Sequence, residues 1–202
     1  VPSLTADVAV VGSGIAGLTA ALAAARAGAR VLLVAKRNLQ ESATYYAQGG
    51  IAAPIREATG EDHVADTLRA GAGLCHEGRV RLMVEEGAAL VTDLLDRGMP
   101  FDRHEGQLAL TLEGGHSERR VLHADGDATG KGLHQWLAAQ AGEQQRLQLL
   151  EEHFAIDLLH DEGTVYGLLC LDTHFGRLLR LDAGAVILAT GGSGQVYRET
   201  TN

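Results

Sequence analysis

The sequence predicts an α/β fold built on a parallel β-sheet, and three observations near its N-terminus support this. Residues 7–11 form an apolar, β-branched run that ends at glycine, and an Ala- and Leu-rich stretch follows at 15–27. A second apolar run covers residues 30–35. Strand, glycine turn, helix and strand within about 30 residues make a βαβ unit, which requires parallel strands with helices on the faces of the sheet.

The first half of the chain continues with one irregular segment and two predicted helices. Residues 38–53 are polar and glycine-bearing without a period, whereas residues 62–72 and 77–97 have helical spacing. The longer helix is predicted to bury one face, which comprises Val80, Met83, Val84, Ala88, Val91, Leu94 and Leu95.

The second half is predicted to change from helix to strand. Residues 101–127 are irregular, and residues 129–146 form a helix with Asp127 or Thr129 as candidate N-cap. Three short runs separated by turns then indicate a β-meander, and a separate buried strand is predicted to lead into a glycine turn. These four segments are residues 152–160, 164–172, 177–182 and 185–189.

Composition excludes several classes of function. The net charge of −9 argues against nucleic acid as a partner, and the densest basic pair, Arg119-Arg120, is expected in a solvated or locally paired loop. No apolar stretch is long enough to span a bilayer, and Cys75 and Cys170 are expected to be buried free thiols in a reducing cytosol. No histidine pattern resembles a metal site. The protein is therefore expected to be cytoplasmic, without membrane or metal.

The strongest local motif is the GxGxxG of residues 12–17, placed between a predicted strand and a predicted helix. Gly12 permits a tight turn, Gly14 lets the backbone approach a pyrophosphate, and Gly17 lets helix and strand pack closely. The helix N-terminus would supply N–H donors to the phosphates. The motif predicts dinucleotide binding.

One common partner of this motif is absent. An acidic residue often binds the ribose hydroxyls at the end of the second strand, but this sequence has Val34-Ala35-Lys36 there. Lys36 cannot accept hydrogen bonds, so it lies either near a phosphate or in solvent.

Residues 42–53, with the sequence SATYYAQGGIAA, resemble the flavin-binding loop shared by the L-aspartate oxidases and the fumarate reductase and succinate dehydrogenase flavoproteins. Paired glycines would let backbone N–H groups approach an isoalloxazine ring. Respiratory members of this family carry covalent flavin on a histidine, and Ala43 takes its place here. The resemblance therefore implies non-covalent FAD.

A second segment, residues 110–123, is similar to the aspartate oxidase segment that contains Glu-Gly-Gly-His-Ser. The family has an arginine before that glutamate, where this sequence has Leu112. The resemblance implies that Glu113 orients the substrate amine, and it makes His116 a second candidate in the site. A surface glutamate is the alternative reading of Glu113.

The resemblance extends along nearly the whole chain. Ala155 and Ile156 align with a strand whose backbone reads adenine, and residues 189–202 with a second glycine turn beside the cofactor. The implied FAD-binding residues are Gly12, Ser13, Gly14, Ile15, Ala16, Gly17, Lys36, Ala43, Thr44, Tyr45, Tyr46, Ala47, Gln48, Gly49, Gly50, Ala155 and Ile156.

The resemblance implies a Rossmann-like FAD-binding domain of the glutathione-reductase-like type over residues 1–202, with a β-meander inserted before the final strand. It also implies oxidation of L-aspartate to iminoaspartate, with oxygen or fumarate as acceptor, in NAD biosynthesis through quinolinate, and an association with quinolinate synthase. The capping domain, the C-terminal helical domain and the catalytic arginine are expected in sequence outside this chain, so the 202 residues alone are expected to be inactive. The alternatives are a fumarate reductase or succinate dehydrogenase flavoprotein and a non-catalytic nucleotide-binding module.

Overall fold

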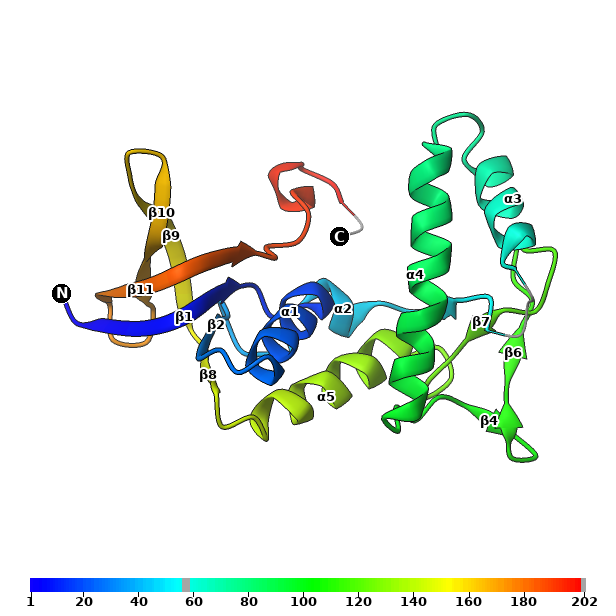
Figure 1. Ribbon diagram of the computed structural model, residues 1–202, viewed down its shortest axis with the longest axis horizontal. Helices are drawn as coiled ribbons and strands as arrows, with labels where there is room; N and C mark the ends of the chain where they lie inside the picture. The colour runs from blue at the N-terminus through cyan, green and yellow to red at the C-terminus, as the bar shows by residue number, and fades with distance from the viewer. Residues whose placement is uncertain (56–58, 201–202) are drawn as a thin grey trace. The chain divides into compact units, whose positions relative to one another are not determined.

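The computed structural model describes residues 1–55 and 59–200 (Figure 1). The chain divides into two compact units. Unit 1 comprises Val1–Tyr46 and Leu133–Asn202, and unit 2 comprises Ala47–Gly132.

A six-stranded sheet forms the centre of unit 1. Four neighbouring strands are parallel and the last two are antiparallel, so the sheet is mixed. In spatial order the strands are β8 (Leu147–Leu150), β2 (Val31–Val34), β1 (Ser3–Val11), β11 (Arg177–Leu188), β10 (Thr164–Asp172) and β9 (His153–Asp161).

Both faces of the parallel part are covered, which explains why all four residues of β2 are buried. Helix α1 (Ile15–Arg26) covers one face with a buried stripe at i, i+3, i+4 and i+7, namely Leu18, Ala21, Leu22 and Ala25. On the other face, Leu168 and Cys170 of β10 pack in one cluster with Leu32 and Val34 of β2. The β-meander therefore curls over the sheet that it extends.

The C-terminal part of α5 (Thr129–Gly142) belongs to unit 1 and lies beside α1, as Figure 1 shows. The Arg26 guanidinium donates a hydrogen bond to Gln140 of α5 at 3.4 Å. Leu133 and Leu137 are buried along this helix.

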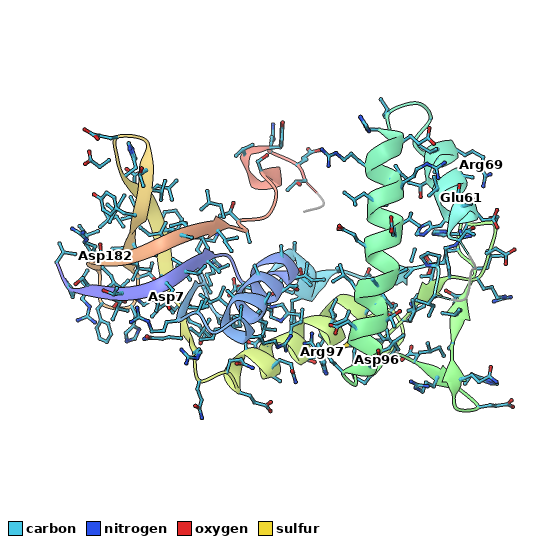
Figure 2. The ribbon with its side chains drawn as sticks, viewed as in Figure 1. Asp7, Glu61, Arg69, Asp96, Arg97 and Asp182 are labelled. Atoms are coloured by element: carbon cyan, nitrogen blue, oxygen red, sulfur yellow. The ribbon has the colours of Figure 1, made fainter. Side chains whose placement is uncertain are left out.

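Unit 2 combines a helix pair with two small sheets. Helix α3 (Glu61–Ala70), on which Figure 2 labels Glu61 and Arg69, packs on α4 (Glu77–Asp96) through Val64, Val80 and Val84. The larger sheet has the order β3 (Ile51–Ala52), β7 (Val121–Leu122) and β6 (Leu110–Thr111), and the smaller sheet pairs β4 (Arg103–His104) with β5 (Gln107–Leu108). The remaining elements lie in unit 1: a one-turn helix α2 (Ala43–Tyr46) and a 3₁₀ turn, η1 (Gly194–Val196).

The predicted βαβ unit, the helices α3 and α4 and the β-meander are confirmed, whereas several other predictions were wrong. Helix α5 ends at Gly142 and not at residue 146, and residues 147–150, to which the sequence assigned no element, form strand β8, which pairs in parallel with β2. Residues 177–182 and 185–189 are not two strands, because β11 runs through both and supplies the third strand of the meander. The meander is therefore continuous with the final strand and not inserted before it.

The last residues of β11 were expected to be buried, but Leu188 is 58% exposed. Pairing with β10 ends at Asp182, so β10 no longer covers the strand beyond that point. Met83 was expected on the buried face of α4 and is 54% exposed, because the helix buries a narrower stripe through Val80, Val84 and Val91.

Both cysteines are free thiols, as predicted, but only one is fully buried. Burial raises the pKa of the Cys170 thiol to about 11, whereas Cys75 is half-buried. Among the described residues, no helix has the length and apolar character needed to cross a membrane.

Candidate cofactor and substrate site

The glycine motif lies where strand β1 passes into helix α1, and its geometry requires glycine at two positions. Gly12 has φ of +112°, and a Cβ there would lie 2.1 Å from the carbonyl oxygen of Ala189. A Cβ on Gly17 would lie 1.7 Å from the carbonyl oxygen of Gly12. Any side chain at either position would therefore separate helix, turn and sheet.

The N-terminus of α1 is open to an anionic ligand. Gly14 is the N-cap residue and supplies no side-chain cap, and the first turn contains no acidic residue. The nearest atom to a Cβ on Gly14 would be the Thr44 hydroxyl at 3.4 Å, and Ile15 and Ala16 are exposed. The partial positive charge of the helix end and the close backbone approach fit the pyrophosphate of a dinucleotide.

The loop predicted to bind flavin is divided between the two units. In unit 1, Ser42 caps the single turn of α2 by accepting a hydrogen bond from the Tyr45 N–H at 3.1 Å. The Thr44 hydroxyl accepts one from the Ile15 N–H at 3.0 Å, which joins this loop to the glycine turn. Ala43 and Tyr46 are exposed.

The rest of the loop lies in unit 2, where Ala47 and Gln48 are exposed and Gly49 adopts φ of +79°. A Cβ on Gly50 would lie 2.4 Å from Val121 Cγ1 and 2.6 Å from the Leu122 carbonyl oxygen. Gly50 is therefore required for strand β3 to approach β7, a packing role that the sequence did not reveal.

The other predicted cofactor residues lie in unit 1. Lys36 is exposed just beyond strand β2, and Ile156 is 47% exposed on β9. Ala155 is half-buried and pairs with Cys170 of β10. Contact of these residues with a cofactor stays a prediction, and Thr201 and Asn202 of the second glycine turn lie outside the described residues.

In unit 2, the carboxylate of Glu113 faces a histidine that sequence reasoning missed. Glu113 Oε1 lies 3.1 Å from Nε2 of His123, and the two side chains are 45% and 16% exposed. Nδ1 of the same ring lies 3.1 Å from the Gly126 carbonyl oxygen, and Nε2 lies 2.9 Å from the Thr111 hydroxyl. Both residues lie in the segment 110–123 that resembles the aspartate oxidases, but only the β6–β7 pairing brings positions 113 and 123 together.

These contacts restrict the protonation of the His123 ring. The Gly126 carbonyl oxygen only accepts, so it takes the hydrogen on Nδ1. An ionised Glu113 also only accepts, so its contact requires a hydrogen on Nε2 and a doubly protonated ring. In a neutral ring, Nε2 would instead accept from the Thr111 hydroxyl.

His116 does not contact the Glu113 carboxylate. Its backbone N–H donates to the Glu113 carbonyl oxygen at 3.1 Å and closes the turn between them. Its Nδ1 lies 3.2 Å from the Arg120 guanidinium, and its ring packs 5.6 Å from the ring of His63. His116 therefore stabilises the loop that presents Glu113.

A buried ion pair anchors this loop to helix α3. Arg120, which is 1% exposed, donates to Asp66 Oδ2 at 2.7 Å, and the backbone N–H and hydroxyl of Ser117 donate to the same oxygen, each at 2.7 Å. Arg69 pairs with the other carboxylate oxygen. The Ser117 N–H and the Arg120 guanidinium hold the pKa of Asp66 well below its ordinary value, although burial opposes them. Of the basic pair, Arg119 is exposed, but Arg120 is locally paired and buried.

The profile of the family described as "FAD binding domain" matches residues 7–202 of the sequence. The chain belongs to this family. The glycine cradle and the N-terminus of α1, whose N-cap residue Gly14 has no side chain, fit the FAD pyrophosphate, and FAD is the cofactor of this domain.

Curated relatives of this FAD-binding domain include two L-aspartate oxidases. That of Streptomyces coelicolor is 47% identical over 99% of this chain and 35% of the relative's length. That of Vibrio cholerae is 42% identical over 97% of this chain and 39% of the relative's length. The chain therefore spans little more than a third of the curated relatives that it matches.

Solved structures confirm the fold of the FAD-binding domain. E. coli quinol fumarate reductase matches with a TM-score of 0.90 and 36% identity, over 98% of this chain and 34% of that chain. Sdh1 of Mycobacterium smegmatis matches with a TM-score of 0.90 and 30% identity, over 100% of this chain and 36% of that chain.

Proposed function

We propose that the protein containing this chain is an FAD-dependent oxidase that converts L-aspartate to iminoaspartate. The observation that carries this proposal is the similarity to L-aspartate oxidases, at 42–47% identity over 97–99% of the chain. The relatives are much longer than this chain, so the proposal concerns the whole protein.

Glu113 is the residue of this chain that we assign to substrate recognition. Its carboxylate is 45% exposed at one edge of the ring of His123. An α-ammonium group would donate a charge-assisted hydrogen bond to this carboxylate, whereas a dicarboxylate without an amine would meet a like charge. This contact would favour aspartate over succinate.

In this reaction the substrate loses two electrons and two protons, a hydride from Cα and a proton from the nitrogen. The flavin supplies the two-electron acceptor when it is bound. The residues of this chain would hold the pyrophosphate at the N-terminus of α1 and orient the amine through Glu113. Orientation of the Cα–H bond is their main contribution to rate.

We further propose that the flavin is held without a covalent bond. Ala43 occupies the position that the respiratory relatives use for covalent attachment, and its methyl side chain has no nucleophilic atom. Precipitating the protein in acid should therefore release all of its flavin into the supernatant. Flavin that stays with the precipitated polypeptide would contradict this.

A second candidate is a fumarate reductase or succinate dehydrogenase flavoprotein. It is favoured by the TM-scores of 0.90 against quinol fumarate reductase and Sdh1, although the sequence identities of 36% and 30% are lower than those to the aspartate oxidases.

Anaerobic reduction of the bound flavin distinguishes the two candidates. The full-length protein that carries this chain is mixed with L-aspartate or with succinate, and loss of the oxidised flavin absorbance is followed. We expect aspartate to reduce the flavin rapidly and succinate to leave it oxidised. Reduction by succinate alone would overturn the aspartate oxidase proposal.

A pair of variants tests the part played by Glu113. Glu113→Gln should raise the KM for L-aspartate by about tenfold to a hundredfold, because the amide lacks the charge that binds the ammonium. Glu118→Gln removes an exposed carboxylate from the same loop and should leave KM unchanged. Equal effects of the two variants would exclude a specific contact at Glu113.

The wider setting follows from the proposed reaction. We propose that oxygen or fumarate reoxidises the flavin, that iminoaspartate feeds quinolinate and NAD synthesis, and that the protein acts in the cytoplasm in association with quinolinate synthase. Product transfer measured with purified quinolinate synthase would test the association.

A further inference from the structure

A side chain from a distant helix binds the middle of the glycine turn. His134 of α5 is 0% exposed, and its Nε2 lies 3.0 Å from the carbonyl oxygen of Ser13. A carbonyl oxygen only accepts hydrogen bonds, so Nε2 carries the hydrogen and donates it. All the residues of this contact belong to unit 1.

This hydrogen bond determines the orientation of one peptide group. A trans peptide is planar, and its C=O and N–H point in opposite directions. Because the Ser13 carbonyl points toward the buried His134, the N–H of Gly14 points the other way. Gly14 is the N-cap residue of α1, where a phosphate is expected to approach.

The surroundings of His134 link it to two further parts of the cofactor site. The ring of Tyr45, from the loop that resembles a flavin-binding loop, packs edge-on at 5.7 Å between centroids. Burial lowers the pKa of His134, against the opposing hydrogen bond that Nε2 donates to the Ser13 carbonyl. The ring is therefore a neutral hydrogen-bond donor and adds no charge to the site. It holds the backbone of the glycine turn, whose own N–H groups are expected to bind the phosphates.

Packing alone does not account for a histidine here. Leucine would fill a buried site on α5 without losing the hydration of an imidazole, as Leu133 and Leu137 do on the same helix. The polar contact that repays this loss is made with the glycine turn.

We propose that His134 is a positioning residue for FAD, which locks the Ser13–Gly14 peptide so that the Gly14 N–H and the N-terminus of α1 face the pyrophosphate. The inference requires FAD binding but does not depend on the identity of the substrate. It therefore stands or falls separately from the aspartate oxidase proposal.

Two amide variants test the donor without removing polarity. The amide nitrogen of His134→Gln can reach the position of Nε2, whereas that of His134→Asn is too short to reach the Ser13 carbonyl. The full-length protein is freed of flavin, and the dissociation constants of FAD, ADP and riboflavin are measured by fluorescence titration and competition. ADP contains the pyrophosphate and riboflavin lacks it.

We expect His134→Asn to weaken FAD and ADP about tenfold, the value of one hydrogen bond, while the affinity for riboflavin is unchanged. His134→Gln should restore FAD and ADP to within about threefold of the parent. Unchanged affinities in the Asn variant, an equal loss for all three ligands, or failure of Gln to rescue would each overturn the proposal.

Leu137→Ala is the matched control, because it removes buried packing from the same helix without touching the turn. It should lower the melting temperature of the apoprotein and leave the ratio of FAD to riboflavin affinity unchanged. A change in that ratio equal to that of His134→Asn would show that any damage to α5 loosens the turn, and would contradict a specific role for the histidine donor.

Discussion

His123 and Asp66 are single residues that organise the loop carrying Glu113. His123 contacts the Glu113 carboxylate, the Thr111 hydroxyl and the Gly126 carbonyl, and Asp66 receives hydrogen bonds from Ser117 and Arg120. His123 ends the segment 110–123 that resembles the aspartate oxidases but received no role from the sequence, and Asp66 lies in a predicted helix without a motif. Their importance follows from the number of polar contacts that each makes.

Replacing His123 should weaken substrate binding if Glu113 receives the amine. In His123→Asn the shorter side chain cannot reach the Glu113 carboxylate, so Glu113 is no longer held in place. We expect the KM for L-aspartate to rise about tenfold, with a smaller change in kcat. His104→Asn, an exposed histidine of the same unit, serves as control. Identical kinetics in the two variants would argue against the positioning of Glu113 by His123.

Replacing Asp66 should destabilise the protein strongly. Asp66→Asn leaves the Arg120 guanidinium buried without its counter-charge, a change that costs about 3–5 kcal/mol in the free energy of unfolding. Urea unfolding measures this loss, and Asp62→Asn on the exposed side of the same helix should cost little. A loss for Asp66→Asn no larger than that of the control would contradict the assigned anchor.

The ion pair of Asp66 with Arg120 should also make the free energy of unfolding depend on pH. The folded pKa of Asp66 is lowered from its ordinary value of 3.8, so its ionised form contributes stability that is present above pH 3.8. That contribution declines as the pH falls below 3.8 toward the folded pKa. The stability difference between parent and Asp66→Asn should therefore be constant near neutrality and shrink in acid. A difference that grows in acid would contradict the lowered pKa.

At the scale of elements, the junction of β1 and α1 tolerates no side chain at two of its positions. The carbonyl oxygen of Gly12 lies against Gly17 of α1, and Gly12 itself lies against Ala189, the residue after β11. Neither glycine therefore has space for a Cβ. The sequence motif indicated this junction, and the structure adds that Ala189 closes it from the other strand.

Two glycine substitutions in helices should have opposite effects. Gly17→Ala places a methyl group 1.7 Å from the Gly12 carbonyl oxygen, so FAD binding and thermal stability should both fall steeply. Gly87→Ala in α4 meets no atom within 4 Å and should stabilise the protein by up to about 1 kcal/mol, because alanine is the better helix former. Melting curves of the two variants, each with and without FAD, check both expectations. Equal stabilisation by both would show that helical propensity, and not the close approach, governs the result.

At the scale of the whole molecule, the cofactor should couple to folding. FAD binds the folded turn and not the unfolded chain, so FAD at 100 times its dissociation constant should stabilise the full-length protein by about 2.7 kcal/mol. The melting temperature should rise with the logarithm of FAD concentration. Gly17→Ala, in which the turn cannot close, should lose this rise. A melting temperature independent of FAD would contradict binding at the native turn.

The sequence by itself determined the βαβ unit, the position of the glycine turn, the two helices of unit 2 and the resemblance to flavoproteins. These features depend on residues that are neighbours in the sequence, so hydrophobic periodicity and turn residues are enough to predict them. It also made Glu113 a candidate for substrate binding, but only through similarity to a family.

Only the tertiary structure decided the rest. Strand β8 was hidden because its parallel pairing with β2 lies more than a hundred residues away in sequence, and β11 was divided in two because its continuity depends on partners on both sides. His134 and His123 look like any other histidine in the sequence. Their roles arise from what folding places against them, the Ser13 carbonyl 121 residues away in one case and the Glu113 carboxylate across a strand pair in the other. Hydrogen bonds of this kind depend on distance and direction in space, which sequence separation does not encode.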